Sequence, residues 1–108
     1  MSTTVTVTST TLSATHPLAT HELAHACGAG VDWVVQLVEV GIVRSRTPAE
    51  RPDDWRFIGA DLQCALEARR LERDFGVGLE AAALILDLEH EVRRLKAVLR
   101  TQGLEREI

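Results

Sequence analysis

The stretch that most constrains the fold is THELAHACGAGVDWVVQLVEVGIV, residues 20 to 43. Apolar residues recur in it at helical spacing, in two runs separated by the turn sequence Cys27-Gly28-Ala29-Gly30. The buried faces that we expect carry Leu23, Ala24 and Ala26 in the first run and Val34, Leu37 and Val38 in the second. Thr20 is the expected N-cap of the first helix, and the second begins near Val31. Two short helices joined by a tight turn form a helix-turn-helix.

The outer face of the second helix carries no cation. A helix-turn-helix that reads DNA needs Arg, Lys or polar donors there, because such groups contact phosphates and base edges. This chain has instead Asp32, Trp33, Val35, Gln36 and Glu39. No Lys or Arg precedes Arg44, and the formal net charge is -4, from 16 acidic and 12 basic side chains. The charge balance disfavours duplex binding by bulk attraction.

Length and cysteine content narrow the class of protein further. A chain of 108 residues can bury one modest core beside one extended element, which leaves little room for an ordinary enzyme cleft. We therefore expect no enzyme activity, no catalytic residues and no cofactor. Cys27 and Cys64 lack CxxC spacing, which favours free thiols in a reducing compartment. Without a signal-like start or a long apolar run, we expect a cytoplasmic protein with no membrane segment.

The chain divides into four expected segments. These are an N-terminal arm or short strand over 1–16, a winged helix-turn-helix domain over 17–78, a long C-terminal helix for dimerisation or packing over 79–102, and a tail over 103–108. The alternation from Thr4 to Thr8 fits either one short strand or a loose arm.

The segment RSRTPAERPDDWRFI, residues 44 to 58, reads as a surface hairpin or wing, because it is polar and holds two prolines. Trp55 and Phe57 point to the same side of this segment if it is extended. Two interpretations stay open. The aromatic side chains close the domain by packing on the helix-turn-helix, or Trp55 belongs to an exposed anchor.

A third helix is expected from about Ala60 to Asp74, and Gly76-Val77-Gly78 breaks it. Its core face carries Leu62, Ala65, Ala68 or Arg69, and Leu71. Leu66 and Phe75 lie off that stripe.

The last helix is expected from Leu79 to about Gln102, on the order of 36 Å long. Its apolar positions alternate steps of four and three, which is the period of a two-helix seam. The seam is Ala81, Ile85, Leu88, Val92, Leu95 and Leu99. Half of it can pack on the domain, and little of the chain is left to cover the part beyond Val92. We therefore expect a homodimer through this helix; the alternative is a frayed, solvated tail.

The sequence HELAH, residues 21 to 25, matches the HExxH pattern of zinc proteases. A hydrolytic zinc also needs a third protein ligand and a peptide cleft, which so short a chain does not offer convincingly. Leu23 and Ala24 are expected in the core, so His21 and His25 lie on the outer face of the first helix. We expect no metal; the alternatives are a zinc hydrolase or a surface metal site that adds His16 or Cys27.

The order of helix, turn, helix, aromatic wing, helix and long seamed helix resembles the MerR-type winged helix-turn-helix family over residues 16 to 102. The resemblance implies a mainly α fold with a short β arm or wing and a long C-terminal helix. Positions that carry Arg and Tyr in DNA-binding members are here Val35, Gln36, Leu37 and Glu39. In the wing, one arginine survives in Trp55-Arg56-Phe57.

These departures resemble a narrower group, the chaperone modulator family typified by CbpM. The shared motifs are VEVGIV, W-x-F before an Asp-Leu helix, RRLERDFG from Arg69 to Gly76, and Leu86-Asp87-Leu88. The resemblance implies binding to the J domain of a DnaJ- or CbpA-like co-chaperone and inhibition of its stimulation of a DnaK-type chaperone.

A J domain presents a basic helix, as the resemblance also implies, so two acidic or apolar surfaces are candidate binding sites. One comprises Asp32, Trp33, Val35, Gln36 and Glu39, and the other Leu66, Phe75 and Leu84. The alternative function is a MerR-family DNA-binding transcriptional regulator, whose phosphate contacts would come from Arg44, Arg46, Arg51 and Arg56.

Overall fold

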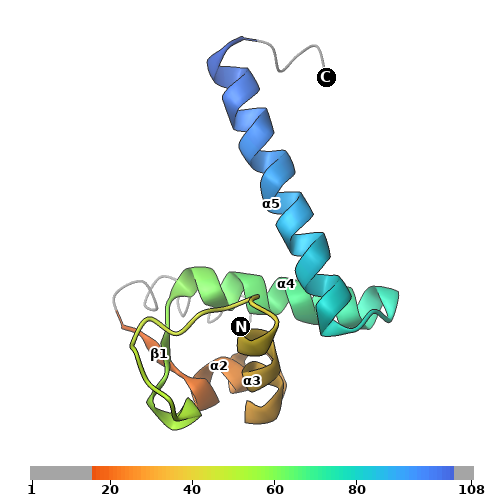
Figure 1. Ribbon diagram of the computed structural model, residues 1–108. Helices are drawn as coiled ribbons and strands as arrows, with labels where there is room; N and C mark the ends of the chain where they lie inside the picture. Colours follow the sequence, from red (N-terminus) through yellow and green to blue (C-terminus); the bar gives the residue numbers. More distant parts are fainter. Residues whose placement is uncertain (1–15, 104–108) are drawn as a thin grey trace, which may run out of the picture.

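The computed structural model describes residues 16–103. The N-terminal arm, except for His16, and the tail after Gly103 lie outside the described residues, so the expected strand near Thr4 is not part of the fold given below. The described elements are β1 (Leu18–Ala19), α2 (Thr20–Ala26), α3 (Val31–Glu39), the 3-10 helix η1 (Pro52–Asp54), β2 (Arg56–Phe57), α4 (Gly59–Phe75) and α5 (Leu79–Thr101). The expected fold class is confirmed: helices dominate, and one small sheet accompanies them (Figure 1).

The small sheet joins the wing to the start of the helix-turn-helix. Strands β1 and β2 pair antiparallel, with Leu18 opposite Phe57 and Ala19 opposite Arg56. The wing therefore pairs with the segment directly before α2. Inside the wing, the Arg46 N–H donates to the Arg56 carbonyl at 2.7 Å, which folds the loop back on β2.

Helices α2 and α3 form the expected helix-turn-helix, and Leu23, Val34 and Leu37 are fully buried. Gly28 has φ +67° in the turn between them, a conformation that residues with a Cβ rarely adopt. One expected core residue is wrong: Ala26 is exposed, and Cys27 is buried instead. The reason is the helical period, which brings Leu23 and the residue four positions later to the same face.

The N-terminus of α2 also differs from the expectation. Ala19, not Thr20, is the N-cap, and Glu22 Oε1 accepts the Ala19 N–H at 2.7 Å. The Thr20 side chain is buried and its hydroxyl donates to the Pro52 carbonyl. Thr20 therefore attaches α2 to the wing.

The wing aromatics pack into the domain. Phe57 is fully buried, and the Trp55 ring meets it edge-on, with centroids 6.2 Å apart and planes at 83°. The Trp55 indole N–H donates to the Ala49 carbonyl at 3.0 Å. Trp55 is half-buried, so the first of the two interpretations, closure of the domain, is the one that the structure supports.

The buried face of α4 is as expected, with Leu62, Ala65, Ala68 and Leu71 in the core. Gly76 at φ +65° ends the helix. The full core also includes residues of α2, α3, α5, β2 and the loop after α3. Its members are Leu23, Ala24, Cys27, Val34, Leu37, Val43, Phe57, Leu62, Ala65, Ala68, Leu71, Leu79, Ala82 and Leu86.

Helix α5 leaves the end of α4 and projects away from the domain (Figure 1). It packs on the core through Leu79, Ala82 and Leu86, whereas Ala81 is exposed. The expectation that the first half of the apolar seam packs on the domain is therefore wrong for Ala81 and Leu88, which are exposed, and Ile85 is only half-buried. The face toward the core lies about a third of a turn from the seam. Among residues 16–103, no helix has the length and apolarity that a membrane crossing requires.

Candidate partner-binding surface

The outer face of α3 exposes polar and acidic side chains. Asp32, Gln36 and Glu39 are exposed, and Val35 is half-buried beside them. We call these four residues the α3 face. It carries two carboxylates and no cation, so a basic partner meets no charge repulsion from α3 itself.

Trp33 lies at the edge of this face and is held by α4. Its indole N–H donates to Glu72 Oε1 at 2.8 Å, and the Arg69 guanidinium carbon lies 5.7 Å from its ring centroid. Arg69 also lies 3.7 Å from Glu72 Oε1 and donates to the Gly28 carbonyl at 3.5 Å. Trp33 is therefore half-buried between two helices and fixes the position of the α3 face on the domain. Its contacts with Arg69 and Glu72 cross 36 to 39 positions of the chain, and sequence periodicity gave no signal for them.

The second candidate surface is divided in space. Leu66 is half-buried against the core, whereas Phe75 is 66% exposed at the end of α4. Nine positions of a regular helix place these two side chains on opposite sides, roughly 13 Å apart along the axis. Leu84 is 62% exposed on α5. Phe75 and Leu84, rather than Leu66, are thus the exposed apolar residues of this set.

Asp61 organises the start of the wing. Its carboxylate is almost fully buried, accepts the Ile58 N–H at 3.0 Å, and receives Nε and Nη2 of Arg46 at 3.2 and 3.0 Å. The Arg44 N–H lies 3.5 Å from the same carboxylate. One side chain therefore caps α4 and orders the loop after α3, a role that the sequence analysis missed. The capping position three residues into α4 was the available signal.

The wing arginines are mostly engaged within the domain. Arg46 is paired with Asp61, Arg56 donates to the carbonyls of Asp53 and Trp55 at 3.2 and 2.7 Å, and Arg51 lies 3.5 Å from the Asp53 carboxylate. The Arg44 side chain is exposed and has no side-chain partner among residues 16–103. Three of the four cations that a DNA-binding wing would use thus already have a local partner.

The HELAH segment, residues 21 to 25, lies on α2 with its polar side chains exposed and its apolar side chains buried. His21 and His25 are exposed on α2, and the Glu22 carboxylate is bound to the Ala19 N–H. Within the described part of the chain, no three His, Cys, Asp or Glu side chains lie together in a way that could hold a metal ion. Glu22 therefore stabilises the helix start in this structure.

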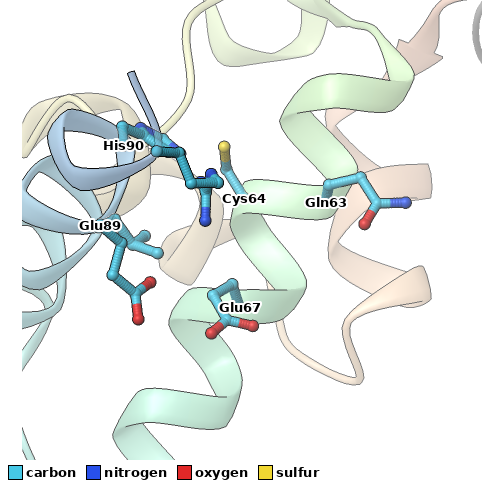
Figure 2. Close-up of a pocket in the computed structure, with 7 residues that line it drawn as sticks. Gln63, Cys64, Glu67, Glu89 and His90 are labelled. Atoms are coloured by element: carbon cyan, nitrogen blue, oxygen red, sulfur yellow. The ribbon is translucent and has the colours of Figure 1, made fainter. Parts of the chain in front are cut away.

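A groove of about 390 Å³ lies between α4 and α5 (Figure 2). It is lined by Gln63, Cys64, Glu67, Leu86, Glu89, His90 and Arg93. Figure 2 shows Glu67 and Glu89 reaching toward the same side of the groove from the two helices. Arg70 hydrogen-bonds to Glu67 and lowers the pKa of that carboxyl group, with a further contribution from Arg93. Burial, and then the charge of Asp61, raises the pKa of the Cys64 thiol.

The two cysteines are free thiols. We expect Cys27 to make the free energy of unfolding fall as the pH becomes alkaline. Burial raises its pKa to about 11 from an ordinary value near 9.0, against a smaller opposing effect of Arg69. Between these values the unfolded thiol ionises while the folded thiol stays protonated, so folding is progressively disfavoured. The free energy of unfolding should fall by on the order of 2 kcal/mol between about pH 9 and 11.

Thermal unfolding followed from pH 7 to 11 measures this loss. The chain has no Tyr, so Cys27→Ala should flatten most of the slope. Cys64→Ala should flatten it less, because the Cys64 thiol, whose pKa is also raised, is less buried than that of Cys27. An equally steep slope in Cys27→Ala would contradict the assignment.

The paired strands, the helix-turn-helix and the wing define a winged helix-turn-helix protein whose α3 face is acidic. The sequence profile of the MerR HTH family of regulatory proteins matches residues 18–102. The chain therefore belongs to the MerR HTH family. Neither a curated protein nor a solved structure gives a significant match.

Proposed function

We propose that this chain is a protein-binding member of the MerR HTH family, a chaperone modulator. In this proposal it binds the J domain of a DnaJ- or CbpA-like co-chaperone and lowers the co-chaperone's stimulation of a DnaK-type chaperone. The role requires neither catalysis nor a cofactor, since occupation of the J domain is enough. The observation that supports it most is the charge of the α3 face, which exposes Asp32 and Glu39 where a DNA-reading helix needs cations.

The geometry of α3 supports recognition of a preformed basic surface. Trp33 fixes the helix to α4 through Glu72 and Arg69, so little order has to be gained when a partner binds. The exposed carboxylates are positioned to attract a basic helix and to orient it, while the partly exposed Val35 supplies apolar contact.

Charge reversal on the α3 face is expected to weaken binding to a purified J domain. Glu39→Lys and Asp32→Lys should each raise the Kd about fivefold at low salt, because one exposed charge contact contributes up to about 1 kcal/mol. The effect should shrink as ionic strength rises. Calorimetric titration of the J domain at two salt concentrations, together with stimulated ATPase activity of the DnaK-type chaperone, measures both quantities.

Glu50→Lys is the matched control, since Glu50 is an exposed carboxylate on the wing loop and not part of α3. If neither α3 variant changes the affinity while the native chain binds, the J domain uses another face. If the native chain fails to bind J domains at all, the proposed function is wrong.

The alternative is DNA binding by a transcriptional regulator of the same family. Against it stand the acidic α3 face and the engagement of Arg46, Arg51 and Arg56 by groups of the wing itself. Fluorescence anisotropy with promoter DNA at low salt separates the two functions. Tight, site-selective binding would replace the chaperone proposal with this one.

A further inference from the structure

His21 and His25 share the outer face of α2 and take no part in the α3 face. Both side chains are exposed, and they stand four positions apart on a regular helix. Residues at this spacing have Cβ atoms about 6 Å apart and are turned by only about 40° from each other around the helix axis. The two imidazoles can therefore direct their ring nitrogens at one point in the solvent beside α2.

The buried residues of α2 fix the side on which the two imidazoles lie. Leu23 and Ala24 are in the core, and the buried Thr20 hydroxyl donates to the Pro52 carbonyl in the wing. A rotation of α2 about its axis would withdraw all three from these contacts. The two histidines are thus held in place before any ligand arrives, so a ligand has to order little more than two side chains.

Other ligating groups on or near α2 are engaged elsewhere. The Glu22 carboxylate accepts the Ala19 N–H at 2.7 Å and so points to the start of the helix. Cys27 is buried, and burial raises its pKa to about 11, so at neutral pH it is a thiol and not the thiolate that binds metals. Among residues 16–103, no three His, Cys, Asp or Glu side chains are placed to hold a metal ion together. The pair therefore offers two nitrogen ligands and no third.

Two imidazoles on one helical face suit one class of ligand. Neutral imidazole nitrogens bind zinc, copper and nickel ions, whereas magnesium and calcium prefer oxygen ligands. Closed structural zinc sites use four protein ligands and catalytic ones three, so a pair gives an open and exchangeable site.

We propose that His21 and His25 form a two-histidine site that binds one divalent nickel, copper or zinc ion, with water in the remaining positions. The bound ion bridges the two turns of α2 and stabilises the first helix of the helix-turn-helix. The site differs from a zinc protease centre, because it has two protein ligands and its Glu22 caps the helix. This inference is independent of which partner the α3 face binds.

Calorimetric titration of the full chain with nickel chloride tests the two ligands. The native chain should bind one ion, and His21→Asn and His25→Asn should each raise the Kd at least tenfold. Removal of one histidine loses both a ligand and the high effective concentration of the second. A native chain that binds no nickel at millimolar metal overturns the proposal, as does native affinity in either variant.

Two control variants test the other possible ligands. His90 is exposed and lines the α4–α5 groove with Cys64 (Figure 2), and His90→Asn should keep the native Kd. Glu22→Gln should also keep it, because glutamine can accept the Ala19 N–H in place of the carboxylate. Loss of binding in His90→Asn would place the ion in the groove, and loss in Glu22→Gln would make Glu22 a ligand. Either result overturns the two-histidine site.

A change of spacing separates arrangement from histidine content. Ala26 is exposed, so the double variant His25→Asn/Ala26→His keeps the core and the number of histidines. Its histidines stand five positions apart, about 140° around the axis, where one ion cannot reach both. The double variant should bind nickel as weakly as His25→Asn alone. Native affinity in it would show that the helical arrangement is irrelevant and would overturn the site.

Thermal unfolding tests whether the ion binds the folded helix. Nickel at about ten times its Kd should raise the Tm of the native chain by about 5 °C, because it binds the folded state in preference to the unfolded one. Neither His21→Asn with nickel nor the native chain with magnesium should show this rise. A native chain that binds nickel without a rise in Tm would place the ligands outside folded α2 and overturn the proposal.

Discussion

Replacing Asp61 with alanine is expected to lower the free energy of unfolding by about 3 kcal/mol, because it leaves several groups unpaired at once. Asp61 is 4% exposed, and its carboxylate binds the Ile58 N–H and the guanidinium of Arg46. The cap contributes about 1 kcal/mol of this, and the rest comes from the ion pair and the loop after α3. Arg46 is one-third exposed, so water compensates part of its loss, which keeps the total below that of a fully buried pair.

Urea denaturation followed by circular dichroism measures this change. Asp61→Asn keeps one acceptor for Ile58 and should lose about half as much. Asp74→Ala is the matched control, since Asp74 lies exposed at the other end of α4, where its contacts with Arg70 and Arg73 exceed 3.5 Å. A loss below about 1 kcal/mol in Asp61→Ala would contradict the role assigned to this carboxylate.

Phe57→Ala is expected to destabilise the fold by about 4 kcal/mol. The ring is completely buried in the core, meets Trp55 edge-on, and belongs to the strand that pairs with Leu18. Its removal opens a cavity at the junction of the wing and the helix-turn-helix. Since small domains have only about 5 to 15 kcal/mol of stability, a sizeable fraction of this variant should be unfolded at moderate temperature.

Phe57→Leu should fold and lose only about 1.5 kcal/mol, which keeps the prediction testable if the alanine variant is insoluble. Phe75→Ala supplies the comparison within the chain, because its ring is two-thirds exposed and its loss should cost less than about 0.5 kcal/mol. Thermal melts of the three variants rank them. Similar losses for Phe57→Ala and Phe75→Ala would mean that the wing does not close the core.

The sequence predicted the features that depend on local periodicity, namely the buried faces and the bounds of helices. The buried stripes of α3 and α4 followed from the 3.6-residue period, and Leu37 and Leu62 lie where that period places them. The bounds of α5 agree to within a residue, since Gly78 precedes it and no breaker occurs before Gln102.

The sequence did not predict interactions between distant segments. Three interactions depend on how the elements pack together. They are the Asp61–Arg46 ion pair, the contacts of Trp33 with Arg69 and Glu72, and the pairing of Leu18 with Phe57. In helix α5, too, the buried face depends on a contact with another segment. Two apolar stripes were available on it, and only the packing on α4 decided that Ala82 and Leu86, rather than Ala81, face the core.

The position of Trp33 has a practical consequence. Its indole borders the α3 face while bonding to a carboxylate of α4, and the chain has only one other tryptophan, Trp55, which is held in the wing. A Trp55→Phe variant would therefore contain a single natural fluorophore beside the α3 face. Its emission would respond to docking there without any attached dye, and would stay constant when the contact is made elsewhere.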